Sequence, residues 1–193
     1  MVVKKSQKLR CFIAILLTEE IKEKAAEIQN RLKKINADVK WVERENLHIT
    51  LRFLGEIEEE TVEKVKSLME EIGKKFSSVR LIFKGIGAFP DSRRPRVIWI
   101  GGEAQMLEKI AEELEKGVRK IGLPPEKPFS FHLTLGRVRS GKNLNSLTKA
   151  MYELSDVDLG EMEANKISLM LSTLYPQGPQ YSVMYEVELS GGR

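Results

Sequence analysis

The chain has 193 residues, of which 41% are hydrophobic and 31% charged, and its formal net charge is +4. This length suits one domain of ordinary size or two small lobes that share a core. The small excess of positive charge fits an anionic ligand without requiring one. Because the sequence has a single cysteine, Cys11, it forms no internal disulfide. No apolar run is long enough to cross a bilayer, so we expect a soluble, cytoplasmic protein. The abundance of Glu and Lys is typical of proteins from hot environments.

The first half of the chain predicts three strands separated by two helices. A buried strand over Leu9–Leu17 precedes a helix whose apolar residues recur from Ile21 to Ile35 at spacings of three and four. A strand follows over Leu47–Phe53, and a second helix has its apolar face between Val62 and Phe76. A further strand near Val79–Ile86 ends this half.

The second half shows the same order of elements after a linking segment rich in Gly, Pro and Arg. The predicted elements are a strand over Arg96–Ile100, a helix over Leu107–Ile121, a strand over Ser130–Leu135, a weaker helix over Leu144–Leu154, and strands over Lys166–Leu174 and Tyr181–Leu189. Two independent landmarks have offsets between the halves that agree to one residue. His48 and His132 lie 84 residues apart, and the apolar runs FIAI and VIWI, which begin at Phe12 and Val97, lie 85 apart.

This agreement indicates a duplicated unit, with repeats at about 9–88 and 96–174 and an added strand at 181–189. Two copies are too few for a solenoid. We therefore predict one bilobal domain over 1–193, of the α+β class. In it, two pseudo-symmetric halves, each with an antiparallel sheet and two helices, face a central cleft.

The two histidines are the only ones in the sequence, and each begins the motif His-x-Thr-Leu. Successive side chains of a strand point to opposite faces. His48 and Thr50 therefore share one face, and His132 and Thr134 share the other strand's corresponding face. Each strand thus presents an imidazole and a hydroxyl on one side and anchors its apolar residues in the core.

Two imidazoles and two hydroxyls suit the opening of a phosphodiester. One histidine can remove a proton from water while the other protonates the departing sugar oxygen, since the ordinary pKa of histidine is near 6.5. Threonine hydroxyls can donate hydrogen bonds to the phosphate oxygens. A single strand histidine is more often structural, but the matched motifs favour catalysis. With two histidines and one cysteine, the sequence contains no zinc-type ligand cluster, and we expect no metal or cofactor.

The sequence resembles the 2H phosphoesterase superfamily, and within it the RNA 2′,3′-cyclic phosphodiesterase branch, which is also called the 2′-5′ RNA ligase family. The resemblance spans about 9–189. It rests on the two His-x-Thr-Leu motifs, on Phe53-Leu54-Gly55-Glu56, Gly85–Pro90 and Gly136-Arg137, and on a late Gly178-Pro179-x-Tyr181. The resemblance implies hydrolysis of a terminal 2′,3′-cyclic phosphate to a 2′-phosphate. It also implies that His48 is the proton donor and His132 the proton acceptor, which the near-symmetric sequence alone could not assign.

The same resemblance implies that Thr50, Thr134 and Arg137 bind phosphate oxygens. Strict strand alternation puts Arg137 on the wrong face, so it reaches the site only if the strand ends or bulges at Gly136. Phe12 is a candidate for stacking on a base, with a core position as the alternative.

Arg52 shares the predicted face of His48 and Thr50 and is a further candidate for substrate binding, with solvated surface as the alternative. A basic rim for RNA phosphates is the hypothesis for four more arginines, Arg93, Arg94, Arg96 and Arg139.

The expected partners are RNA ends that carry a 2′,3′-cyclic phosphate, among them tRNA fragments, and we expect a monomer with no membrane association. Two alternatives remain open. The same residues could join RNA halves through a 2′-5′ bond, with a sugar hydroxyl replacing water. A related variant would act on small cyclic phosphates of nucleotides. The chain could also be an RNA-end-binding module without turnover, although binding alone does not need two titrating groups.

Overall fold

The computed structural model describes residues 8–191. Within this part of the chain, nine strands and four α-helices follow one another together with one 3₁₀ turn, η1. The first elements are β1 (Leu9–Leu16), α1 (Glu19–Lys33), β2 (Val39–Trp41), η1 (Arg44–Asn46), β3 (His48–Ile57), α2 (Glu59–Lys75) and β4 (Val79–Phe89). The remaining ones are β5 (Val97–Glu103), α3 (Gln105–Ile121), β6 (Leu133–Val138), α4 (Leu144–Glu153), β7 (Asp158–Ala164), β8 (Lys166–Tyr175) and β9 (Gly178–Glu188).

The four predicted helices are all present, and local chemistry explains where they begin and end. The Thr18 hydroxyl accepts a hydrogen bond from the Ile21 amide at the start of α1, where Glu19 and Glu20 also suit the positive end of the helix dipole. α3 ends at Gly122, whose φ of 101° is the left-handed conformation that glycine adopts easily. Among residues 8–191, no helix has the length and apolarity needed to cross a membrane.

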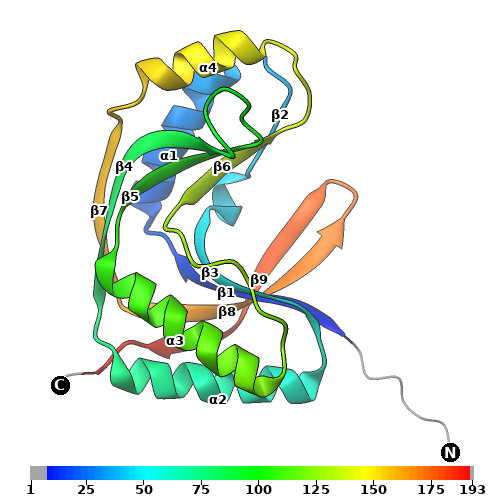
Figure 1. Ribbon diagram of the computed structural model, residues 1–193, viewed down its shortest axis with the longest axis vertical. Helices are drawn as coiled ribbons and strands as arrows, with labels where there is room; N and C mark the ends of the chain where they lie inside the picture. Colours follow the sequence, from blue (N-terminus) through cyan, green and yellow to red (C-terminus); the bar gives the residue numbers. More distant parts are fainter. Residues whose placement is uncertain (1–7, 192–193) are drawn as a thin grey trace, which may run out of the picture.

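The strands form two antiparallel sheets, which make the predicted two-lobed α+β fold. Sheet A has the order β3-β1-β8-β9, and sheet B has the order β2-β6-β5-β4-β7. Each sheet therefore takes strands from both halves of the chain. Helices α2 and α3 pack on one another beside sheet A, and α1 and α4 lie beside sheet B (Figure 1).

The apolar positions of the two histidine motifs lie in one continuous core. Ile49, Leu51, Leu133 and Leu135 are all buried there, together with Ile13 of β1. Burying each such side chain contributes about 1.5–3 kcal/mol. The predicted anchoring of the motifs is confirmed, so both histidine strands are held firmly from the side opposite their histidines.

The sequence did not predict two of the strands. In β7, buried and exposed residues alternate in part, but charged residues and Gly160 separate the buried Leu159, Met162 and Ala164. β2 is three residues long and is stabilised by its pairing with β6 rather than by its own composition. In addition, β6 begins at Leu133, so His132 lies at the entrance of its strand rather than inside it.

Candidate active site

His48 is the first residue of β3, and its two ring nitrogens have different partners. Nδ1 lies 2.7 Å from the carbonyl oxygen of Asn46, and Nε2 lies 2.9 Å from the hydroxyl of Thr50. Because a carbonyl can only accept, Nδ1 must carry a hydrogen. In the neutral ring, Nε2 is then the atom that can accept a proton. The structure thus brings His48 and Thr50 together, as strand alternation predicted.

The ring of His132 is oriented in the same way as that of His48, by the backbone carbonyl two residues before it. Its Nδ1 lies 2.7 Å from the carbonyl oxygen of Ser130, which again leaves Nε2 as the atom free for proton transfer. Orientation of a ring through a backbone carbonyl fixes its tautomer and its direction. Both histidines therefore present Nε2 through the same local geometry.

The two histidines lie close enough to influence one another. Burial lowers the pKa of His48 below its ordinary value, the hydrogen bond to Asn46 raises it, and the charge of His132 lowers it. We call the side of sheet A that carries His48 and the side of sheet B that bears Thr134 the histidine faces. Strand β3, which begins at His48, contacts strand β6, which begins just after His132, so these two faces are adjacent.

Each histidine motif contains a β-bulge at its leucine. In the pairing of β1 with β3, Ala14 lies opposite Thr50 and Ile13 lies opposite Arg52, so Leu51 is the extra residue. In the pairing of β5 with β6, Trp99 lies opposite Thr134 and Ile98 lies opposite Gly136, so Leu135 is the extra residue. A bulge shifts the alternation of all side chains that follow it.

The bulge at Leu51 makes the prediction for Arg52 wrong. Arg52 does not share the face of His48; its side chain is 5% exposed and pairs with Glu115 at 2.5 Å. Further donors of its guanidinium bond the carbonyl oxygens of Phe53 and Pro124. Phe53 takes the position predicted for Arg52: it is 51% exposed, and its ring lies 6.1 Å from that of Phe12.

The bulge at Leu135 has the opposite consequence for Arg137. Strict alternation directed this side chain away from the site, and the bulge reverses that direction. Arg137 is exposed, and its charge lowers the pKa of Tyr181, against the larger effect of burial, which raises it. The bulge lies at Leu135, one residue before the expected Gly136, and Lys40, the cross-strand partner of Arg137, lies beside Gly178 of sheet A. That Arg137 binds phosphate stays a prediction.

Aromatic rings surround His48. The Phe12 ring lies 4.9 Å from the His48 ring, and the Tyr181 ring lies 5.4 Å away, nearly perpendicular to it. Phe12 is only 3% exposed and packs with Ala14 and Met170 in a small cluster separate from the main core. Phe12 thus packs against the imidazole of His48 and has little exposed surface left on which a nucleobase could stack. The half-buried Tyr181 and the exposed Phe53 have more ring surface available, and the sequence had not identified either as a candidate for stacking on a nucleobase.

His132 also lies beside an aromatic pair. The Phe89 ring is 5.1 Å from His132 in an edge-on arrangement and 5.3 Å from Trp99. The indole of Trp99 lies over Gly87, where any Cβ would overlap the ring. The absence of a side chain at Gly87 is therefore what makes room for Trp99.

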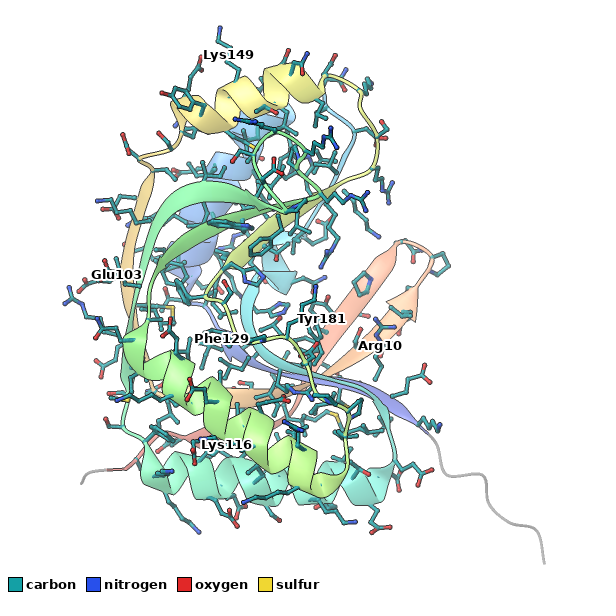
Figure 2. The ribbon with its side chains drawn as sticks, in the orientation of Figure 1. Arg10, Glu103, Lys116, Phe129, Lys149 and Tyr181 are labelled. Atoms are coloured by element: carbon teal, nitrogen blue, oxygen red, sulfur yellow. The ribbon has the colours of Figure 1, made fainter. Side chains whose placement is uncertain are left out.

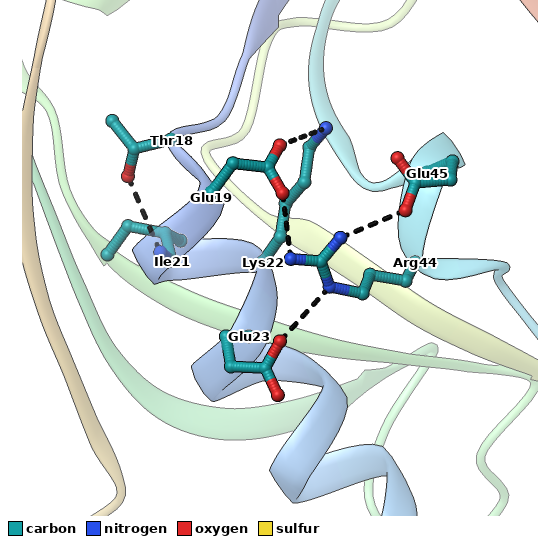
Figure 3. A network of polar contacts seen from close by, with 7 residues as sticks. All are labelled: Thr18, Glu19, Ile21, Lys22, Glu23, Arg44 and Glu45. Atoms are coloured by element: carbon teal, nitrogen blue, oxygen red, sulfur yellow. Dashed lines mark hydrogen bonds and ion pairs between the residues drawn. The ribbon is translucent and has the colours of Figure 1, made fainter.

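A polar network fixes the turn that precedes His48 (Figure 3). Arg44 in η1 pairs with Glu19 at 2.7 Å, Glu45 at 2.9 Å and Glu23 at 3.3 Å. Two of these carboxylates belong to the first turns of α1. The network therefore joins α1 to η1, whose last residue, Asn46, orients the His48 ring.

The four arginines of the predicted basic rim are all exposed, at Arg93, Arg94, Arg96 and Arg139. The first two belong to the loop between β4 and β5, where the Asp91 carboxylate accepts hydrogen bonds from the Arg93 and Arg94 amides. Their role in RNA binding stays a prediction.

Three other features have no part in the arrangement of the histidines. A hollow of about 510 Å³ is lined by residues of α2 and α3, away from the histidine faces. Within residues 8–191, no three His, Cys, Asp or Glu side chains converge in a way that could hold a metal ion. Cys11 is buried, and burial raises the pKa of its thiol to about 11, which suits an unreactive packing role.

The fold and the two histidine motifs define a two-lobed phosphoesterase of the α+β class, and comparison with known proteins identifies its family. The family model described as LigT like Phosphoesterase matches residues 15–99 and 101–181. The chain therefore belongs to the LigT-like phosphoesterase family, which is a family of enzymes.

Its relatives are similar over nearly their whole length. A protein of Methanocaldococcus jannaschii named RNA 2′,3′-cyclic phosphodiesterase is 40% identical over 178 residues, covering 92% of this chain and 99% of the relative. A protein of the same name from Aquifex aeolicus is 39% identical over 192 residues, covering 95% and 98%.

Among solved structures, TT0787 of Thermus thermophilus superimposes with a TM-score of 0.82 at 29% identity, covering 96% of this chain and all of that one. The apo form of E. coli LigT has the same fold, with a TM-score of 0.77 at 24% identity and coverage of 95% and 98%.

Proposed function

We propose that the chain hydrolyses the 2′,3′-cyclic phosphate at the end of an RNA to a 2′-phosphomonoester, without a metal ion. The observation that carries this proposal is the matched presentation of two imidazoles, each with Nδ1 held by a backbone carbonyl at 2.7 Å, so that Nε2 is the atom available for proton transfer. The relatives' name, RNA 2′,3′-cyclic phosphodiesterase, supports the same substrate class.

The proposed reaction is a single displacement at phosphorus. His132 Nε2 accepts a proton from water, whose oxygen forms a bond to phosphorus. The bond between phosphorus and the sugar 3′ oxygen breaks, and His48 Nε2 donates a proton to that oxygen. General acid and base catalysis of this kind contributes about 10²–10⁴-fold per group. Protons and charge balance without any further reactant.

Three more side chains assist this displacement in the proposal. The hydroxyls of Thr50 and Thr134 and the guanidinium of Arg137 would contact the non-bridging phosphate oxygens, where negative charge increases in the transition state. Phe12 packs against His48 rather than against the substrate in this proposal, because its side chain is only 3% exposed. Arg52, which is committed to Glu115, has no part in it.

The lowered pKa of His48 must be reconciled with its role as proton donor. Burial and the charge of His132 both disfavour its protonated form in the free protein. A cyclic phosphate carries one negative charge, and an anion beside Nε2 raises the pKa of an imidazole. We infer that the substrate itself supplies the charge that makes His48 a donor.

The position of the product phosphate tests this assignment. An oligonucleotide that ends in a 2′,3′-cyclic phosphate should give a 2′-phosphate, because His48 protonates the 3′ oxygen. Digestion with a phosphatase and a nuclease that distinguish the two isomers would identify the product. A 3′-phosphate would contradict the proposed roles. A 2′-5′-joined product from two RNA halves, formed in place of the hydrolysed one, would favour the ligase alternative.

A further inference from the structure

The hairpin of β8 and β9 bends over the histidine face of sheet A. The side-chain amide of Asn46 donates a hydrogen bond of 2.9 Å to the carbonyl oxygen of Pro179. Asn46 directly precedes the β3 region, whereas Pro179 lies in β9, and the sheet order places β1 and β8 between these two edge strands. A flat sheet would hold them far apart, since neighbouring strands are about 4.8 Å apart. The hairpin, orange in Figure 1, therefore curls across toward the residue that orients His48.

The hairpin brings apolar and aromatic surface to the site. Tyr181 of β9 contacts the rings of both His48 and Phe12. Leu174 lies opposite Pro179 in the hairpin and is 63% exposed, and Tyr175 at the end of β8 is 50% exposed. Exposed side chains of this kind are suited to packing against nucleobases, and an aromatic ring can stack on any of the bases. Figure 2 labels Tyr181 at the base of the hairpin, with Arg10 of β1 nearby.

Sheet B contributes positive charge at the tip of the same hairpin. Lys40 of β2 is the cross-strand partner of Arg137 of β6, so the two side chains share a face of the sheet. The Lys40 ammonium nitrogen lies 3.6 Å from where a Cβ on Gly178 would be, at the start of β9. Both cations are exposed, and neither forms an ion pair with any residue in the range 8–191.

We propose that Lys40 and the β8–β9 hairpin form a subsite for the nucleotide on the 5′ side of the cyclic-phosphate nucleotide. Lys40 binds the phosphate that joins these two nucleotides, while Arg137, its neighbour across the strands, contacts the reacting phosphate. The base of the preceding nucleotide packs on Leu174 and Tyr175. This subsite rests on the proposed function and extends it from the reacting end to the adjoining chain.

Charge and exposure together indicate single-stranded RNA as the occupant. A phosphate complements the unpaired ammonium group of Lys40, and an unpaired base has a free face for the apolar side chains of the hairpin. A duplex hides its base faces in the stack and offers only phosphates and groove edges. An apolar peptide would leave Lys40 and Arg137 without partners.

The test compares two substrates that differ by one nucleotide, that is, by a preceding adenosine and the phosphate that joins it to the reacting nucleotide. Adenosine 2′,3′-cyclic phosphate has only the reacting phosphate, whereas the dinucleotide ApA with a terminal 2′,3′-cyclic phosphate also has the phosphate assigned to Lys40. Lys40→Ala should lower kcat/KM for the dinucleotide by about tenfold, as expected for loss of one hydrogen bond to a charged group. For the mononucleotide the change should stay within about twofold. Lys149→Ala is the matched control, because Lys149 is an exposed lysine on α4, far from the hairpin (Figure 2).

A second variant and the salt dependence sharpen the result. Leu174→Ser should lower kcat/KM for the dinucleotide alone, through a higher KM. The salt dependence of kcat/KM for the dinucleotide should also weaken in Lys40→Ala, because one phosphate contact is lost. Equal effects of Lys40→Ala on both substrates, or no effect on either, would overturn the subsite while the proposed reaction stands. If the wild-type protein opens neither substrate, the proposed reaction fails and the subsite fails with it.

Discussion

Leu51 and Leu135 occupy equivalent β-bulges, each at the fourth position of a histidine motif. In both strands the bulge follows the threonine directly, and in β3 His48 and Thr50 keep a common face. The side chains after the bulge change faces, which buries Arg52 and turns the exposed Arg137 to the face of Thr134. The two halves of the site therefore share a backbone irregularity as well as a sequence motif.

Gly87 keeps the space in which Trp99 packs against Phe89, whose ring in turn packs against His132. A Cβ at Gly87 would be 2.5 Å from Cζ2 of Trp99. Gly87→Ala should therefore displace the indole, lower kcat severalfold and cost about 1–3 kcal/mol of unfolding free energy. Tryptophan fluorescence and thermal unfolding would measure these effects. Gly141→Ala is the control, because a Cβ there meets nothing within 4 Å. Unchanged fluorescence and activity in Gly87→Ala would contradict this view of Trp99.

Arg52 joins the histidine strand β3 to the segment that leads from α3 to His132. It pairs with Glu115 at 2.5 Å and with Glu126 at 3.5 Å, and Glu126 also accepts a hydrogen bond from the Phe53 amide. Arg52→Met should cost about 1–3 kcal/mol of unfolding free energy, because it leaves the half-buried Glu115 carboxylate and the carbonyl oxygens of Phe53 and Pro124 without their donor. Denaturant unfolding would measure the loss.

The exposed arginine Arg80, paired with Glu161, provides the comparison for Arg52. Arg80→Met should change the unfolding free energy by only about 0–1 kcal/mol, since an exposed pair is well solvated. Similar losses in the two variants would show that the Arg52 cluster has no special structural weight.

The pKa of His48 makes the stability of the fold depend on pH. Burial lowers this pKa in the folded state relative to the unfolded value near 6.5. Between these two pKa values the unfolded chain binds the proton and the folded chain does not, so the contribution of His48 to stability falls as the pH decreases through this window. Above 6.5 the effect is constant.

His48→Gln should consequently lose less stability than the wild-type protein between pH 7.5 and pH 5.5. Denaturant unfolding at the two pH values gives the difference. Addition of inorganic phosphate should raise the pKa of His48, since an anion favours the imidazolium. The NMR signals of the His48 ring, recorded against pH with and without phosphate, would measure this shift. Equal losses in the two proteins, with no response of the ring to phosphate, would contradict the proposed environment of His48.

The helices and the motif strands could be predicted because their sequences carry strong periodicity. The apolar residues of α1, α2 and α3 recur at helical spacing, and Ile49 and Leu133 alternate with the residues of the site. The duplicated unit at about 9–88 and 96–174 stays a prediction. Strand β7 has too few apolar residues to be distinguished from a loop, and its pairing with β4 determines its conformation.

The content of the site was predictable only as far as strand alternation holds. Alternation correctly paired His48 with Thr50 and failed beyond the bulge, where Arg52 and Phe53 exchange positions. No residue in the motif signals this bulge before Leu51, whereas Gly136 gave a reason to expect one in the second motif. Tyr181 reaches His48 only because the β8–β9 hairpin curls, a long-range feature that the local sequence does not encode.

The central claim is that His48 and His132 together open a cyclic phosphate with water. The most direct measurement incubates the protein and a chelator with an RNA oligonucleotide that ends in a 2′,3′-cyclic phosphate, and follows its mass. We expect a gain of one water molecule, with the rate lowered by about 10²–10⁴-fold in His48→Ala and in His132→Ala while circular dichroism shows both variants folded. No gain of water by the wild-type protein, or losses below tenfold in both variants, would contradict the account.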